Sequence, residues 1–191
     1  MKKTSSRTRA VTGGAIVAAL ALGGFGAYSA SATGETAAAA PAAAVAKADV
    51  KNKNTTGSTH LTIEAATKAA QATLDAAEKE NQRVSVAVVD RNGNTLVTLR
   101  GDGAGPQSYE SAVKKAYTAV SWNAPTSELV KRLTNAPTLK DIPGTLFLAG
   151  GAPVATGNHQ GAPIAGIGVA GAPSGDLDEK FAQAGVAALA K

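Results

Sequence analysis

The stretch RVSVAVVDRNGNTLVTLR, residues 83–100, constrains the fold more than any other part of the sequence. Two runs rich in Val, Leu and Thr flank the dipeptide Asn92–Gly93. β-branched residues favour strands, and Asn-Gly is a preferred pair for a type I′ turn. The pattern therefore predicts a β-hairpin, and with it a sheet that contains an antiparallel pair.

The segments around the hairpin predict helices and further strands. In residues 61–82, apolar residues recur every three to four positions, which is typical of an amphipathic helix, and Thr62 is suited to cap it. Further helices are expected at about residues 107–121, 126–133 and 174–190. Short apolar runs bounded by Gly and Pro predict three more strands, at 145–150, 151–156 and 162–170. This order favours an α+β sandwich, with a five-stranded antiparallel sheet flanked by helices.

Residues 1–32 have the composition of a secretory signal peptide. A basic start precedes an apolar run at 15–30, which ends in the A-x-A motif of Ala30, Ser31 and Ala32. An uncleaved membrane anchor is the alternative, although the run is short for a span and rich in Gly. Residues 33–58 are low in complexity and mostly Ala or polar, which predicts a flexible tether. The folded domain is therefore expected at 59–191.

Cleavage changes the charge of the chain. Four of the 19 Lys and Arg residues precede residue 33, and none of the 14 Asp and Glu residues do. A chain cleaved there keeps 15 basic and 14 acidic residues. This near balance argues against a nucleic-acid partner. The chain has no Cys, and its one Met is Met1, so the exported protein would lack the two most easily oxidised side chains.

Two short motifs have both a functional and a structural interpretation. GIGVAG at 166–171 matches G-x-G-x-x-G, but no βαβ unit follows it, so the glycines are better explained by close packing than by a dinucleotide. Asp75 and Glu78 form a D-x-x-E pair on one helix face and could share a hard cation such as ferric iron. Such pairs are also common on solvated helices. No hydrolase motif stands out.

The helix expected at 107–121 gathers an unusual set of side chains near one face. Lys114 and Lys115 precede Thr118 by three or four residues, and Trp122 follows it by four. Tyr117 lies beside Thr118. Two cations, aromatic rings and a hydroxyl at this spacing indicate either a ligand site or an ordinary half-buried helix.

Four blocks of the chain, in order, closely resemble the GlcG/HbpS family of haem-degrading proteins. They are residues 61–105, 107–122, 144–154 and 164–185, and together they cover nearly all of 59–191. The resemblance implies a profilin-like sandwich, a homo-octamer and an extracellular or cell-wall-associated location. It also implies haem and iron binding, slow haem degradation, and service as an accessory redox and haem sensor to a membrane histidine kinase under oxidative stress.

The resemblance also implies roles for individual residues. Thr118 matches the threonine thought to contact haem iron, and Asp75 with Glu78 matches the surface iron motif. In that setting Lys114 or Lys115 would meet a propionate, and Tyr109, Tyr117 or Trp122 would stack on the ring. The conventional axial ligands in the exported chain are His60, His159, Tyr109 and Tyr117. The alternative is structural: Thr118 bonds its own i−4 carbonyl, Trp122 is core, and the lysines are solvated.

Three functions remain open at this level. The first is a secreted haem- and iron-binding module that signals through a sensor kinase. The second is a haem-degrading or peroxide-consuming enzyme, which the lack of Cys and Met would suit equally well. The third is a binder of another small cofactor such as a corrinoid, which the export signal disfavours because such relatives are intracellular.

Overall fold

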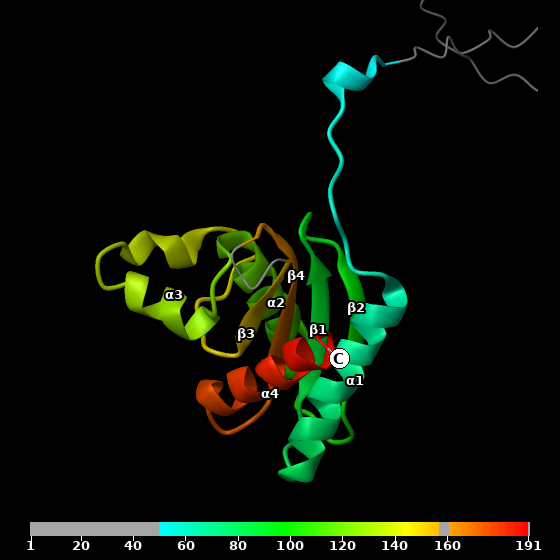
Figure 1. Ribbon diagram of the computed structural model, residues 1–191. Helices are drawn as coiled ribbons and strands as arrows, with labels where there is room; N and C mark the ends of the chain where they lie inside the picture. Colours follow the sequence, from blue (N-terminus) through cyan, green and yellow to red (C-terminus); the bar gives the residue numbers. More distant parts are fainter. Residues whose placement is uncertain (1–49, 157–160, 191) are drawn as a thin grey trace, which may run out of the picture. The chain divides into compact units, whose positions relative to one another are not determined.

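The computed structural model describes residues 50–156 and 161–190 (Figure 1). The described residues form four α-helices, two 3-10 turns and four strands. In chain order these are η1 (Asn52–Asn54), α1 (Ile63–Lys79), β1 (Ser85–Asp90), β2 (Thr95–Arg100), α2 (Pro106–Trp122), α3 (Thr126–Arg132), η2 (Pro137–Asp141), β3 (Gly151–Ala155), β4 (Pro163–Ala170) and α4 (Gly175–Ala188). The helices lie where the apolar periodicity predicted them, and the expected α+β class is confirmed.

The sheet is antiparallel throughout and has four described strands in the order β2-β1-β4-β3. The prediction of five strands was wrong at residues 145–150, which form no strand. In that segment the amide of Leu146 donates to the Thr118 hydroxyl instead of to a strand, and Gly150 has a φ of 128°. A bond to a helix side chain and a residue with positive φ both interrupt a β-ladder.

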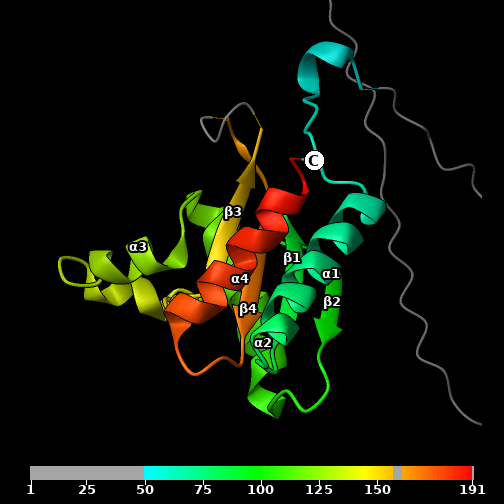
Figure 2. The same ribbon diagram turned by 60° about the horizontal axis from the view of Figure 1, so that its bottom comes forward.

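Helices cover both faces of the sheet. Figure 2 shows α1 and α4 side by side on one face and α2 on the other. Alternate residues of β1 divide between two cores: Val86 and Val88 pack with α1 and α4, whereas Ala87 and Val89 pack against α2. This alternation follows from the two-residue period of a strand, and it explains why every residue of β1 is buried.

Glycines in β4 bring α2 unusually close to the sheet. A Cβ added at Gly166 would collide with the carbonyl oxygen of Ala116, and one at Gly168 would collide with that of Ala112. The G-x-G spacing places both glycines on the same face of β4, where α2 crosses it. The packing interpretation of GIGVAG is therefore confirmed.

The hairpin is present, but its turn differs from the prediction. A type I′ turn needs positive φ at both central residues, whereas only Gly93 has it here, with a φ of 88°. The amide of Gly93 donates to the carbonyl of Asp90, and the amide of Asp90 donates to the carbonyl of Asn94. The connection is therefore a three-residue hairpin loop, longer than the two-residue type I′ turn, and it ends in Gly93 with a left-handed backbone conformation. The Asp90 carboxylate selects it by accepting hydrogen bonds from the amides of Asn92 and Asn94.

Between α2 and β3 the chain makes an excursion, residues 123–150, that carries α3 and η2 away from the sheet (Figure 1). The excursion has its own small core of Ala124, Leu129 and Phe147, against which Trp122 packs. The Trp122 and Phe147 rings meet edge to face, with centroids 5.2 Å apart. Trp122, the last residue of α2, thus packs that helix against the core of the excursion.

Several predictions fall on residues that the structure does not describe. The expected signal peptide, most of the tether and His159 all lie there. Residues 50–60 are described and exposed throughout. No described helix is long and apolar enough to cross a membrane.

Candidate functional site

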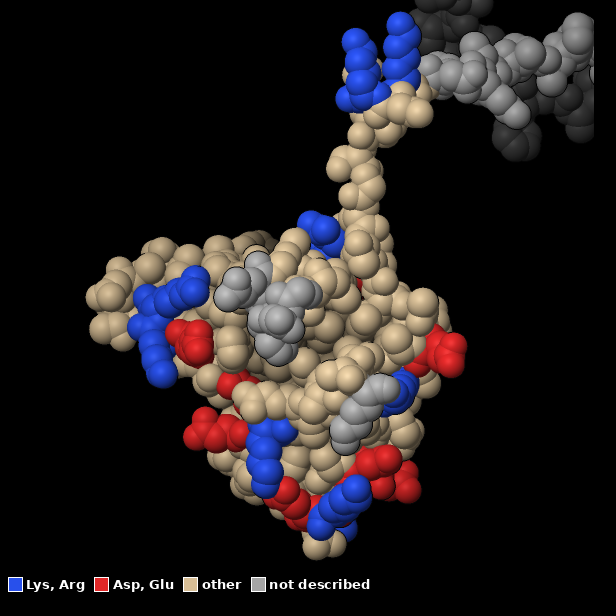
Figure 3. Space-filling model, viewed as in Figure 1, with Lys and Arg blue, Asp and Glu red and all other residues tan. Residues whose placement is uncertain are grey.

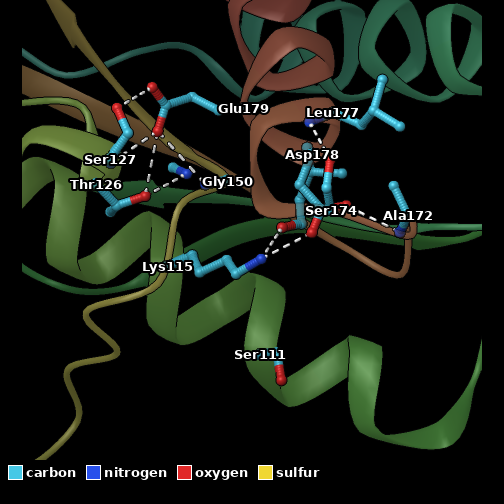
Figure 4. A network of polar contacts seen from close by, with 12 residues as sticks. Ser111, Lys115, Thr126, Ser127, Gly150, Ala172, Ser174, Leu177, Asp178 and Glu179 are labelled. Carbon is cyan, nitrogen blue, oxygen red and sulfur yellow. Dashed lines mark hydrogen bonds and ion pairs between the residues drawn. The ribbon is translucent and has the colours of Figure 1, made fainter. Parts of the chain in front are cut away.

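Lys115 lies in the interior, not on the surface where a ligand could reach it. Its Nζ is 2.8 Å from Oδ2 of Asp178 and donates to the carbonyl oxygen of Val169 at 3.0 Å (Figure 4). Both charged side chains are almost fully buried. The pair joins α2 to the first turn of α4 and to the end of β4. Binding a propionate through Lys115 would require breaking this pair.

The neighbouring carboxylate, Glu179, fixes the start of α3. It accepts hydrogen bonds from the Ser127 amide at 2.9 Å and the Ser127 hydroxyl at 2.6 Å. The Thr126 hydroxyl in turn accepts the amide of Gly151 at 2.8 Å. Burial raises the pKa of the Asp178 carboxyl above its ordinary value, while the Lys115 ammonium acts in the opposite direction. Within the described residues no buried side-chain polar atom lacks a partner, so this network is closed.

Sequence analysis missed this network, although the sequence holds a signal for it. Asp178 lies three and four residues before the buried Phe181 and Ala182, on the inner stripe of α4. Lys115 has the same position on α2, between the buried Ala112 and Ala119. Opposite charges on the buried stripes of two helices indicate an ion pair, because an unpaired charge there is very costly.

Thr118 is fully buried, and its hydroxyl is engaged on both sides. It donates to the carbonyl of Lys114 at 2.7 Å, which is the i−4 bond of the structural alternative, and accepts the amide of Leu146 at 2.8 Å. Contact between Thr118 and iron stays a prediction that requires the loop around Leu146 to move.

The remaining candidates on α2 do not converge on one site. Lys114 is partly exposed and pairs with Glu110 one turn away, with Nζ and Oε1 2.6 Å apart. The Tyr117 ring lies against Gly93 and near Gly144, and Trp122 packs in the excursion. Tyr109 is exposed, and its hydroxyl meets that of Thr98 at 3.2 Å. The helix therefore spreads its aromatic rings over separate surroundings.

His60, by contrast, lies between a buried carboxylate and a hydroxyl. Its Nδ1 lies 3.8 Å from Oδ2 of Asp90, and its Nε2 lies 2.6 Å from the hydroxyl of Ser58. The imidazole is about a third exposed, with 34% of its surface accessible, whereas the Asp90 side chain keeps only 9%. A metal-binding His commonly donates its other ring N–H to a carboxylate, and the Asp90 carboxylate lies on that side of the ring, at a distance longer than a hydrogen bond.

Asp90 is itself held firmly at the end of β1. Burial alone would raise its pKa, but hydrogen bonds from the Asn94 side chain and from the amides of Asn94 and Asn92 outweigh burial and lower the pKa. The carboxylate therefore stays ionised at neutral pH and faces the ring. His60 and Tyr117 both border the turn that follows Asp90, since Tyr117 lies against Gly93.

The two carboxylates predicted to bind iron, Asp75 and Glu78, lie on the exposed side of α1. Asp75 accepts a hydrogen bond from Gln71 at 2.7 Å, and Glu78 borders a hollow of about 230 Å³ with Arg83 and Asp102. The described residues contain no group of three or more His, Asp and Glu side chains that could hold a metal.

On the face of the molecule shown in Figure 3, acidic and basic side chains are interspersed.

An apolar hollow of about 450 Å³ lies between β3 and the second half of α4. Small side chains line it, including Ala152, Pro153 and Ala187, together with Asn123 and Gln183. The described residues that line it offer an apolar wall but none of the usual axial ligands of haem.

Comparison with known proteins identifies the same family that the blocks of sequence indicated. The family model described as haem degrading protein HbpS-like matches residues 61–187. The crystal structure of a double mutant of HbpS from Streptomyces reticuli is 73% identical, covers 75% of this chain and 97% of its own, and superposes with a TM-score of 0.72. The crystal structure of a PduOC:haem complex is 27% identical, covers 68% of this chain and 95% of its own, and gives a TM-score of 0.61. An uncharacterised 15.0 kDa protein of Citrobacter freundii, from the dhaT-dhaS intergenic region, is 34% identical over 116 residues, which are 58% of this chain and 80% of that relative.

Proposed function

Because the chain belongs to the HbpS-like family of haem-degrading proteins, we propose that it binds haem and that His60 would hold the iron. Two findings support haem as the ligand: the family model spans residues 61–187, and a relative with the same fold was crystallised as a haem complex. The observation that carries the assignment of the ligand is the Asp90 carboxylate facing Nδ1 of an accessible imidazole.

The donors of the chain fit this cofactor. His60 would supply Nε2, and the exposed Arg91, which directly follows Asp90, is a cation suited to a propionate. Ile63, the first residue of α1, is 59% exposed and would offer apolar surface to the ring. When bound, haem would supply a redox-active iron that responds to oxidants.

An open position at His60 suits exchange better than storage. Its ring is a third exposed, and the residues before it, 50–59, are exposed throughout. A cofactor held there would be buried on one side only, so its dissociation would be faster than from an enclosed pocket. Reversible loading is what a protein needs if it reports the haem concentration around it.

The further parts of the proposal concern location and partners. The signal-peptide composition of residues 1–32 supports export, and a secreted haem sensor needs a membrane receptor, for which a sensor histidine kinase is proposed. A homo-octamer is proposed as the assembled form. Asp75 and Glu78 are proposed to bind iron, since both carboxylates are exposed and lie on one helix face.

A haemin titration followed by absorbance tests the site. Wild type should bind saturably, and His60→Ala should lose the Soret band. His159→Ala is the matched control, because it removes the other histidine, and it should bind normally. If Thr118→Ala loses binding while His60→Ala keeps it, the ligand is wrongly assigned. If wild type fails to bind haemin at micromolar concentrations, haem binding itself is refuted.

Haem degradation is the second candidate function, because the matched family is described by it. Adding an electron donor to the haem-loaded protein should then bleach the Soret band and release iron. More than one haem consumed per protein molecule would establish an enzyme. Stoichiometric bleaching that stops after one haem would favour a binding protein whose cofactor is damaged incidentally.

A further inference from the structure

We propose that Asp90 is a positioning residue for His60, which fixes the ring nitrogen that is free to bind iron and strengthens it as a donor. This inference rests on the proposed haem site. Asp90 lies in the hairpin that the sequence predicted, yet nothing in that pattern assigns it a function beyond the turn.

The hairpin holds the carboxylate in place. Oδ1 accepts the amides of Asn92 at 2.8 Å and Asn94 at 2.9 Å, whereas Oδ2 accepts only the side-chain amide of Asn94, at 3.0 Å. A carboxylate oxygen has two lone pairs, so Oδ2 keeps one for a further donor. That oxygen is the one that faces Nδ1 of His60.

The distance from Oδ2 to Nδ1, 3.8 Å, is longer than a hydrogen bond, so the two groups face each other without being bonded. The two sides differ in freedom, because Asp90 is held by three hydrogen bonds and His60 follows an exposed segment. Only the imidazole would therefore have to move to bring Nδ1 within hydrogen-bond distance of Oδ2. Ligation to iron would fix the ring in one orientation and allow that bond to form.

Ser58 contacts the other nitrogen of the ring. Its hydroxyl lies 2.6 Å from Nε2, to which it donates when the ring proton is on Nδ1 and from which it accepts when that proton is on Nε2. A proton on Nδ1 faces the Asp90 carboxylate, which is the favourable arrangement of charge. In that tautomer the Ser58 hydroxyl occupies the lone pair that iron would take, and the exposed Ser58 can leave it without disturbing a core.

The carboxylate has two chemical consequences. It selects the tautomer whose Nε2 lone pair is available, and it makes that lone pair more basic. A more basic ligand stabilises ferric over ferrous iron, so the reduction potential falls. A role confined to the turn would produce neither effect, because the turn needs only acceptors, Oδ1 for the backbone amides of Asn92 and Asn94 and Oδ2 for the Asn94 side chain.

Asp90→Asn keeps an amide oxygen that can accept the backbone amides of Asn92 and Asn94, whereas it loses the charge and the second oxygen, which accepts the Asn94 side chain. With haemin and the full exported chain, this variant should bind about 10–100-fold more weakly, the usual cost of losing such a partner. Its midpoint potential should rise by about 59 mV for each tenfold loss of preference for ferric iron. Asp102→Asn, which removes an exposed acid from another loop, should change neither quantity.

A measurement without haem guards against a misfolded variant. The ¹⁵N shifts of His60 in the free wild-type protein should report a proton on Nδ1, and Asp90→Asn should shift the ring toward the other tautomer. Asp90→Glu, which keeps the charge, should restore part of the wild-type affinity and potential. If Asp90→Asn leaves affinity, potential and tautomer unchanged while His60→Ala abolishes binding, the positioning role is refuted and the haem site stands. If His60→Ala binds haemin normally, the proposed site and this inference both fail.

Discussion

Breaking the buried pair of Lys115 and Asp178 should destabilise the domain more than any surface substitution. The side chains are 6% and 5% exposed, and Nζ and Oδ2 are 2.8 Å apart. At an effective dielectric constant of about 20, two unit charges at that distance attract by about 6 kcal/mol. Removing one partner leaves the other charge buried, which typically costs about 3–5 kcal/mol. Since a domain is stable by about 5–15 kcal/mol, Lys115→Met would remove a large share of that stability.

A double-mutant cycle in denaturant, at one protein concentration, measures this effect. Lys115→Met and Asp178→Asn should each lower the free energy of unfolding by about 3–5 kcal/mol. In Asp178→Asn the side chain can still accept the amide of Ala172, which Asp178 accepts at 3.0 Å. Because the double variant leaves neither charge unpaired, it should cost clearly less than the sum of the two single variants. Lys114→Met is the matched control, because Lys114 is 40% exposed, and it should cost less than about 1 kcal/mol. If either buried single variant costs under about 1 kcal/mol, or if the two effects simply add, the argument for a desolvated pair is wrong.

Three further predictions concern packing, pH and local stability. Gly168→Ala should lower the melting temperature sharply, or prevent folding, because its Cβ would collide with the backbone of α2; Gly57→Ala, with nothing within 4 Å, should have no such effect in the same thermal scan. The pKa of Asp90 is lowered in the folded protein, so its contribution to stability should be present above about its unfolded value of 3.8 and lost as the pH falls through the lower folded value. Urea unfolding of wild type and Asp90→Asn from pH 7 to pH 2 should therefore show a difference in stability that shrinks in acid. A difference that grows in acid would contradict the assignment. Glu179→Ala should speed hydrogen exchange in α3 but not in α1, since it removes both hydrogen bonds to Ser127. Asp176→Ala, which removes an exposed acid, is the control and should leave α3 protected. Equal exchange rates of α3 in the two variants would contradict the role of Glu179.

The sequence was a good guide wherever local pattern decides structure. Apolar periodicity located the helices, and Thr62 and Ser174 cap α1 and α4 by accepting the amides of Ala65 and Leu177. The same reasoning failed at residues 145–150, because an apolar run between Gly residues predicts a strand only if a neighbouring strand is free to pair with it. Here the amide of Leu146 pairs with the Thr118 hydroxyl.

The candidate site shows the same division. Sequence reasoning listed His60 as a conventional ligand but had no means of finding Asp90, which is 30 residues away and came to notice only as part of a hairpin. It also grouped Lys115 with Thr118 and Trp122 by helical spacing, although α2 turns these side chains into different surroundings. Helical spacing gives the direction of a side chain, and only the packed neighbours decide what that side chain meets.

The sequence by itself determined the hairpin, the amphipathic helices, the glycine face of β4 and membership of the family, because each depends on residues close together in the chain or on their order. Only the tertiary structure decided that Lys115 is neutralised by Asp178, 63 residues away, that Thr118 holds the excursion, and that Asp90 faces His60. The physical reason is that burial and charge pairing depend on which elements pack against each other. A charge on a helix is solvated or buried according to the surface that covers it, and that surface comes from a distant part of the chain.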